Sequence, residues 1–194
     1  MATIYLIRHG ETEWSLSGQH TGKSDIELTP NGREQAECVK DLIRKVSFVR
    51  VLSSPRKRAV ETANIVGLGS RVEKRDELAE IDYGDFEGLT LQQVREKVPD
   101  WTVWTHPCPN GESLQQAADR ARKLLDELKS TEGSVALFAH GHILRVFACV
   151  YLGAPPQDGK HLMLDTCSVS ILAHEHETPA IKMWNARSTN DNNQ

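Results

Sequence analysis

Two histidine–glycine pairs directly follow short apolar segments of this chain. Arg8, His9 and Gly10 follow "TIYLI", and His140 and Gly141 follow "SVALFA". A strand ending in Arg-His would bring a cation and an imidazole to the edge of a sheet, where glycine lets the chain pass close to a ligand. Such a combination suits the binding of an oxyanion. For Arg8 or His9 taken alone, a strand end that reaches solvent is the more ordinary interpretation.

A third basic segment lies between these two pairs. "SSPRKRAVETA" carries Arg56, Lys57 and Arg58 at the turn from a strand-like to a helix-like segment. A solvated basic turn accounts for two of the three residues, and the residue pattern does not select the one that enters a site. The segment after Gly141 is helix-like, and the N-terminus of a helix favours anions. Together the three segments predict one anion site.

The elements that would position these residues alternate between strand-like and helix-like patterns. The alternation predicts an α/β fold with three layers, in which helices cover both faces of a mostly parallel sheet and ligands bind at the carboxyl ends of the strands. The last two strands would form a hairpin. We expect strands at 3–8, 48–54, 134–139, 168–175 and 180–186, and helices at 28–46, 57–66, 91–98, 113–130 and 142–153.

Length and composition limit the remaining choices. The 194 residues fit one domain over 1–187, followed by a polar tail at 188–194 that we expect to be disordered. A net charge of -4 argues against general nucleic-acid binding. Because no apolar run approaches the roughly 20 residues of a membrane span, and the N-terminus does not resemble a signal peptide, we expect a cytoplasmic protein without a membrane partner.

Four segments, in order, resemble the signature of a known family. "RHGETEW", "SSPRKRAVETA", "ELAEIDYGDFEG" and "AHGHILR" are similar to segments of the histidine phosphatase superfamily, the group related to cofactor-dependent phosphoglycerate mutase. The resemblance spans nearly the whole chain and implies a phosphoglycerate mutase-like α/β/α sandwich. It implies that His9 is the phosphate-accepting nucleophile, that Glu80 is the proton donor, and that Arg8, Arg58 and His140 form the phosphate pocket.

The chemistry of phosphoryl transfer is consistent with these residue types. Fixed guanidinium groups compensate the charge on the transferring oxygens. His9 must attack as a neutral imidazole, with the proton of its other nitrogen held by a backbone carbonyl and its pKa lowered by nearby cations. Glu80 would protonate the departing alkoxide and then activate water. Without the resemblance, Glu80 would be interpreted as an ordinary surface acid.

The resemblance also implies a set of substrate contacts besides Arg8 and Arg58, namely Ser15, Thr21, Gly22, Tyr83 and Gly141. Ser15 departs from the family pattern, because many relatives have asparagine there. His20 either lines the entrance or faces solvent. Trp101, Trp104 and His106 either form a lid over the substrate or pack a satellite core. We expect no metal and no cofactor.

The branch of the family is indicated by "EWSLSGQHTG" and "DWTVWTHPCPNGES". They are similar to the branches with sedoheptulose bisphosphatase and broad-specificity acid phosphatases, and the chain lacks the extra cover of true mutases. We therefore expect a metal-independent phosphatase for small phosphomonoesters, with sugar phosphates or bisphosphates as substrates and a small phosphorylated metabolite as partner. The sequence does not determine the oligomeric state, and a homodimer is one option.

Three alternatives stay open at this point. A phosphoglycerate mutase would share every catalytic residue named above. A catalytically silent phosphate-binding module would have lost at least one of them. A metal-dependent hydrolase is suggested by His140-x-His142 and His174-x-His176, although histidines near a hairpin turn are ordinarily solvated.

Overall fold

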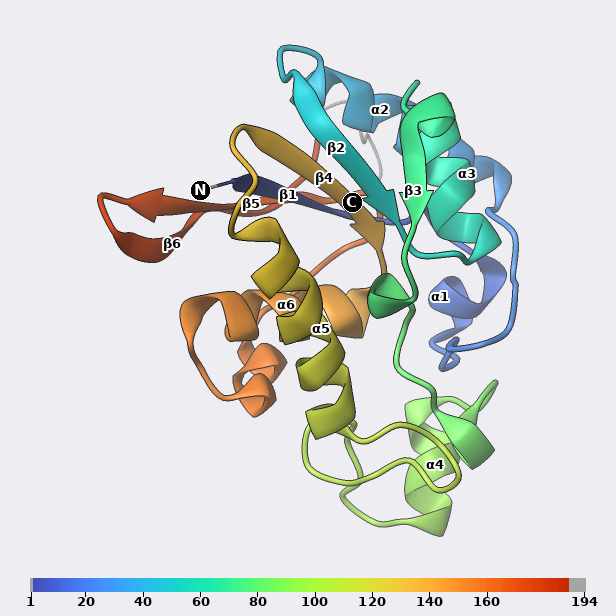
Figure 1. The fold of residues 1–194 in the computed structure, drawn as a ribbon. Helices are drawn as coiled ribbons and strands as arrows, with labels where there is room; N and C mark the ends of the chain where they lie inside the picture. The colour runs from blue at the N-terminus through green and yellow to red at the C-terminus, as the bar shows by residue number, and fades with distance from the viewer. Residues whose placement is uncertain (1, 189–194) are drawn as a thin grey trace.

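A six-stranded sheet forms the centre of the computed structural model, which describes residues 2–188 (Figure 1). The strand order is β3-β2-β4-β1-β5-β6. β1, β2, β3 and β4 run parallel to one another, whereas β5 and β6 form an antiparallel hairpin whose β5 strand pairs antiparallel with β1. This confirms the mostly parallel sheet and the final hairpin. The strands are β1 (Thr3–Arg8), β2 (Phe48–Ser53), β3 (Val72–Lys74), β4 (Ser134–Ala139), β5 (Val169–Glu175) and β6 (Thr178–Ala186).

Helices cover both faces of the sheet (Figure 1). α2 (Pro30–Ile43) and α3 (Lys57–Ile65) lie on one face, and α5 (Leu114–Leu128) and α6 (Gly141–Leu152) lie on the other. The central strand β4 shows why, because its side chains alternate between two cores. Val135 and Leu137 pack with α5 and α6, whereas Ala136 and Phe138 pack with α2 and α3. The predicted three-layer α/β/α sandwich is confirmed.

Local sequence signals set most of the helix ends. Thr29 caps α2, where its hydroxyl accepts a hydrogen bond from the Gly32 N–H at 2.9 Å, and Pro30 follows at the first helical position. Gly153 ends α6 in the left-handed conformation, with φ of 72°. α2 is shorter than the predicted 28–46, because the cap lies at Thr29 and the last turn closes at Ile43.

Two short elements escaped the sequence analysis, α1 (Glu13–Ser17) and β3. Each is too short for a hydrophobic period to reveal it. α4 (Leu91–Lys97) was predicted, and it lies in the long excursion between β3 and α5 at the lower edge of Figure 1. This excursion also carries Glu80. Glu80, the expected proton donor, therefore comes from a segment that is not part of the alternating strands and helices.

Two further expectations concern the chain as a whole. Of the polar tail predicted at 188–194, residues 189–194 lie outside the described residues. Between residues 2 and 188, none of the helices combines the length and the apolar character needed to cross a bilayer.

Cys108 and Cys149 are buried and form no disulfide, and burial raises the pKa of these thiols to about 12 and about 11. Both act as small apolar core residues.

Candidate active site

The register of the sheet brings the two histidine–glycine pairs together. β1 and β4 are adjacent and parallel, and Arg8 at the end of β1 pairs with Ala139 at the end of β4. The next residues are His9 and His140, whose ring centroids lie 5.1 Å apart. The His9 backbone N–H donates to the Ala139 carbonyl at 3.0 Å, which continues the strand pairing into the loop. The prediction that both pairs share one edge is therefore correct.

His9 is held as a neutral imidazole with one nitrogen available. Its side chain is almost fully enclosed, and Nδ1 lies 2.7 Å from the Gly10 carbonyl oxygen. Because a carbonyl only accepts, Nδ1 carries the proton and Nε2 keeps its lone pair. Burial, followed by the charges of Arg58 and Arg8, lowers the pKa of His9 well below 6.5. This is the protonation state that a nucleophilic histidine requires.

Gly10 allows the loop after β1 to pass against α2. A Cβ atom at Gly10 would lie 2.3 Å from the Gly32 carbonyl oxygen, which is too close for any side chain. The Gly10 N–H donates to the Thr62 hydroxyl on α3 at 3.1 Å. Helices on the same face of the sheet thus fix the loop that orients His9.

Arg8 presents a buried donor that lacks a partner. Its Nη1 donates to the Leu164 carbonyl oxygen at 2.5 Å, whereas Nε is buried and bonds to no described residue. Buried polar groups in proteins nearly always find hydrogen-bond partners. An unpaired guanidinium nitrogen beside His9 therefore fits a site for an anionic ligand.

Arg58 is the basic residue of its turn that reaches the site, while Lys57 is exposed. Arg58 is fully buried, and its Nε donates to His140 Nδ1 at 3.1 Å. The other ring nitrogen of His140, Nε2, lies 2.7 Å from the Ser54 hydroxyl oxygen. Arg58 also donates to the carbonyl oxygens of Thr21 and Ser24, at 2.9 Å and 2.8 Å. Arg58 thereby fixes both His140 and the loop at 21–24.

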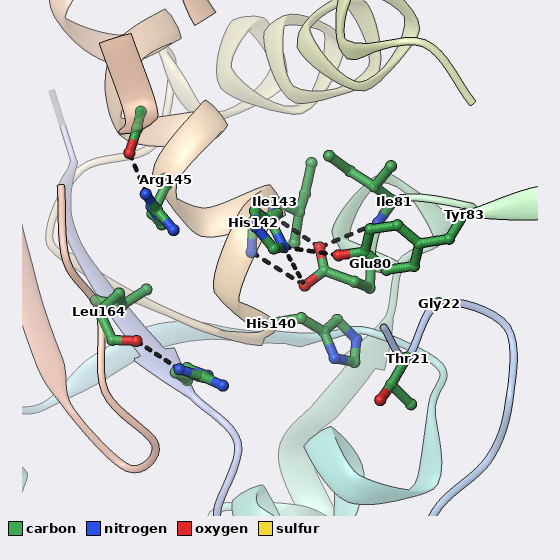
Figure 2. A network of polar contacts seen from close by, with 12 residues as sticks. Thr21, Gly22, Glu80, Ile81, Tyr83, His140, His142, Ile143, Arg145 and Leu164 are labelled. Carbon is green, nitrogen blue, oxygen red and sulfur yellow. Dashed lines mark hydrogen bonds and ion pairs between the residues drawn. The ribbon is translucent and has the colours of Figure 1, made fainter. Parts of the chain in front are cut away.

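Glu80 is bound by the N-terminal turn of α6 (Figure 2). Its Oε1 accepts the N–H groups of Ile81 and Ile143 at 3.0 Å and 2.9 Å, and Oε2 accepts that of His142 at 3.0 Å. The N-cap residue of α6, His140, makes no side-chain cap of its own. Glu80 therefore caps this helix from a distant segment, and the helix in turn fixes the carboxylate beside the site.

A cavity of about 190 Å³ opens in front of His9. Several predicted site residues line it, namely Arg8, His9, Ser15, Thr21, Glu80, Tyr83 and Gly141. Arg58, His140 and Gly22 are not among the lining residues. His140 contacts the His9 ring from outside the lining, and Arg58 bonds to His140. Gly22 supports the wall through its backbone, because its N–H donates to the Glu87 carboxylate at 2.9 Å.

Two hydroxyl groups on the cavity wall also serve the backbone. The Ser15 hydroxyl accepts the Thr12 N–H at 2.9 Å and donates to the Thr12 carbonyl, which forms the capping box of α1. The Thr21 hydroxyl donates to the Gln19 carbonyl at 3.1 Å. Both residues can still offer an oxygen lone pair to a ligand, but neither has an uncommitted hydroxyl proton.

The cavity contains a second arginine that the sequence analysis did not identify. Arg145 lines the wall opposite the strand ends, stacks over Trp104 with 4.4 Å from Cζ to the ring centroid, and donates to the Gly159 carbonyl at 2.8 Å. A signal was present, because Arg145 follows Gly141 by four residues and so occupies the same face of α6. The conformation of 156–161, however, has no sequence signature, and that segment fixes the guanidinium.

The aromatic segment packs a core and does not form a lid. Trp101 is 1% exposed, donates from Nε1 to the Pro107 carbonyl at 3.2 Å, and meets Phe86 edge to face. Trp104 lies under Arg145, outside the cavity lining. His106 bonds to its neighbour Thr105 and is also absent from the lining. By contrast, His20 lines the cavity, where its ring packs edge-on against Tyr83 and Trp101.

Of the four histidines that suggested a metal site, His140, His142 and His174 have other hydrogen-bond partners, and His176 is exposed. His142 Nδ1 lies 2.6 Å from the Tyr83 hydroxyl, and His174 Nδ1 lies 3.1 Å from the Tyr151 hydroxyl. Within residues 2–188, no three His, Cys, Asp or Glu side chains gather in an arrangement that could hold a metal ion. The two spacing motifs therefore do not converge on a common centre in the described part of the chain.

Comparison with known proteins agrees with this geometry. The chain is 41% identical to an acid phosphatase of Mycobacterium tuberculosis over 179 residues, which cover 89% of this chain and 87% of the relative. It is 31% identical to sedoheptulose 1,7-bisphosphatase of Saccharomyces cerevisiae over 220 residues, covering 96% and 80%. A 2,3-bisphosphoglycerate-dependent phosphoglycerate mutase is also among the relatives.

A solved structure and a family model cover nearly the whole chain. The structure of the Rv3214 protein of Mycobacterium tuberculosis superposes with a TM-score of 0.90 and 38% sequence identity, covering 96% of this chain and 98% of that one. The family model for branch 1 of the histidine phosphatase superfamily matches residues 4–187. With its paired histidines, its fold and its phosphatase relatives in agreement, this chain belongs to the histidine phosphatase superfamily and is a phosphatase.

Proposed function

We propose that this phosphatase hydrolyses small phosphomonoesters, in particular sugar phosphates or bisphosphates, through a phosphohistidine at His9 and without a metal ion. One observation carries the proposal. His9 is neutral, its Nδ1 proton is held by the Gly10 carbonyl, and it stands beside the unpaired buried Nε of Arg8. A nucleophile and an oxyanion donor are thus adjacent before substrate binds.

In the first step, His9 Nε2 attacks the phosphorus, an N–P bond forms, and the P–O bond to the leaving alcohol breaks. Arg8 stabilises the equatorial oxygens through Nε, and Arg58 adds positive charge from behind His140. Glu80 gives its proton to the departing oxygen. Its Oε2 suits this role, because it accepts one backbone N–H whereas Oε1 accepts two.

In the second step, water attacks the phosphohistidine. Glu80, now a carboxylate, removes a proton from the water as the new O–P bond forms and the N–P bond breaks. Inorganic phosphate leaves, and His9 returns to its neutral form with Nδ1 still bonded to Gly10. A single carboxyl group serves both steps, because it ends the first step without its proton.

Cavity size and charge support a small, polar substrate. The cavity of about 190 Å³ suits a small, polar ester. Arg145 provides a second cation at a distance from the phosphate-binding Arg8. The position of Arg145 within the same cavity favours a bisphosphate or another doubly anionic ester.

Two other functions are less well supported. A phosphoglycerate mutase would use the same His9, Glu80 and Arg58. A silent phosphate-binding module would not need a nucleophile whose Nδ1 proton is fixed. Nor would it need the carboxyl group of Glu80 to be held by three backbone donors. Rapid interconversion of phosphoglycerates without phosphate release would make the protein a mutase, and absence of both activities would favour the binding module.

The decisive experiment combines a substrate screen with trapping of the intermediate. Phosphate release is measured across sugar phosphates, sugar bisphosphates, phosphoamino acids and an aryl phosphate. We expect the sugar esters to give the highest kcat/KM, and a phosphotyrosyl peptide that exceeds them would refute the substrate class.

Rapid quenching should reveal acid-labile phosphate in the wild type and none in His9→Ala, which should also lose turnover. His106→Ala, which alters a histidine outside the cavity, serves as the control. Full activity in His9→Ala, or an EDTA-induced loss that zinc or magnesium restores, would contradict the mechanism.

A further inference from the structure

A tyrosine–histidine pair beside Glu80 has no role in the two chemical steps. Tyr83 follows Glu80 by three residues, and His142 lies in the first turn of α6 (Figure 2). The Tyr83 hydroxyl and His142 Nδ1 are 2.6 Å apart, and both residues line the cavity that contains His9. Figure 2 shows the pair next to the Glu80 carboxylate.

The surroundings of the pair determine which atoms carry protons. Burial raises the pKa of Tyr83 well above 10, so the phenol stays protonated. Within residues 2–188, the hydroxyl has no acceptor other than His142 Nδ1. Donation from the Tyr83 O–H to Nδ1 is the arrangement that satisfies the phenol within the protein.

His142 is consequently a donor at its other nitrogen. Burial, with the charge of Arg145, lowers the pKa of His142 well below 6.5, so the ring is neutral. A neutral imidazole has one N–H, and because Nδ1 accepts, the proton is on Nε2. This nitrogen has no partner in the described part of the chain and is not among the buried unpaired atoms. The side chain is 26% exposed, and it lines the cavity.

The position of this donor relates it to the leaving group. The backbone N–H of His142 bonds to Glu80 Oε2 at 3.0 Å, and Nδ1 lies 3.8 Å from the same oxygen. The ring is therefore anchored next to the acid that protonates the leaving oxygen. Arg8 and Arg145 already supply positive charge in the cavity. The uncharged His142 ring therefore contributes a directional hydrogen-bond donor without adding charge.

We propose that His142 Nε2–H donates a hydrogen bond to an uncharged oxygen of the leaving alcohol, a hydroxyl or carbonyl near the scissile ester, and that Tyr83 is a positioning residue that fixes this tautomer. The inference rests on the proposed function and specifies its substrate class as oxygen-rich alcohols. An aryl phosphate has no such oxygen beside the ester, so the donor would stay unpaired in that complex and reduce its stability.

Variants of the pair test the assignment through a substrate ratio. The kcat/KM for fructose 1,6-bisphosphate, divided by that for p-nitrophenyl phosphate, should fall about tenfold or more in His142→Leu, as expected for one lost hydrogen bond. His142→Gln keeps a side-chain N–H and should recover part of the ratio. In Tyr83→Phe the ratio should fall by a smaller factor, about threefold, chiefly through KM, because the donor survives in a fraction of the molecules.

The matched control is a second tyrosine–histidine pair on the far side of the fold. Tyr151 and His174 are joined by the same kind of bond, at 3.1 Å, and neither lines the active-site cavity. Tyr151→Phe and His174→Leu should leave the substrate ratio at its wild-type value. A fall in these controls as large as in His142→Leu would overturn the assignment, because the substrate ratio would then respond equally to a pair outside the active-site cavity.

A spectroscopic readout separates this inference from the proposed function. The ¹⁵N chemical shifts of His142 in the resting wild-type protein should show the proton on Nε2, and Tyr83→Phe should shift the ring toward a mixture of tautomers. A proton on Nδ1 in the wild type, or an unchanged ratio in His142→Leu, would overturn the role of His142. The absence of phosphohistidine on His9 would instead overturn the proposed function, and the tautomer measurement does not depend on turnover.

Discussion

Lowering the pH from 7 to 5 should destabilise the folded protein, because three histidines at the active site resist protonation. Burial is the largest cause at each, and the charges of Arg58 or Arg145 add to it, so the pKa values of His9, His140 and His142 all lie well below 6.5. In the unfolded chain these imidazoles titrate near 6.5. Below that pH the unfolded state binds more protons than the folded state, so the free energy of unfolding falls as the pH falls.

The size of the effect follows from proton linkage. Each histidine contributes up to about 1.4 kcal/mol per pH unit once the unfolded imidazole is fully protonated. Between pH 7 and pH 5 this integrates to about 2 kcal/mol per histidine and about 6 kcal/mol for the three, as an upper limit reached when the folded imidazoles stay neutral throughout. Compared with total stabilities of about 5–15 kcal/mol for single domains, this loss is large.

Urea unfolding followed by circular dichroism at pH 7, 6 and 5 measures this loss. The range ends at pH 5 because Glu77 and Glu127, whose pKa values are lowered to about 2 in the folded protein, add their own linkage at lower pH. His142→Gln removes one of the three groups and should reduce the pH dependence by about one third. Equal free energies of unfolding at pH 7 and pH 5, or NMR titration of His9 near 6.5, would refute the reasoning.

Four further predictions concern single substitutions. Gly10→Ala should destabilise the fold by about 1–3 kcal/mol in urea unfolding, because its Cβ would lie 2.3 Å from the Gly32 carbonyl oxygen; an unchanged midpoint would contradict this. Glu80→Gln should lower kcat for sugar phosphates by about 100-fold or more but affect an aryl phosphate far less; equal losses would argue against the acid role. Trp101→Ala should cost about 3–5 kcal/mol of stability, whereas a lid residue would cost little. Arg145→Ala should raise KM for a bisphosphate about tenfold relative to a monophosphate, and equal changes would exclude a second-anion contact.

Much of the architecture follows from local patterns in the sequence. The short apolar segment 134–139 predicted a strand, and β4 confirms it, with cores on both of its faces. The capping residue Thr29 and the terminal Gly153 marked helix ends, because caps act through bonds within one turn. The strand-end position of His9 and His140 predicted their meeting, since parallel strands bring their carboxyl ends to the same edge.

The shape and recognition properties of the site depended on contacts between distant segments. Whether Trp101 packed or covered the site could not be inferred from its side chain, because both roles use the same aromatic surface. The anchoring of Glu80 by α6 joins residues about 60 positions apart, and the fixation of Arg145 needs a carbonyl from an irregular segment.

The sequence by itself thus determined the elements, the edge at which they meet and, through resemblance, the chemistry of His9. Only the tertiary structure decided which side chains line the cavity and which act from outside it, as with Arg8 in the lining and Arg58 bonded to His140. The physical reason is the range of the interactions. Periodicity and capping are set by neighbours along the chain, whereas hydrogen-bond partners such as Tyr83 and His142 are set by the packing of whole elements.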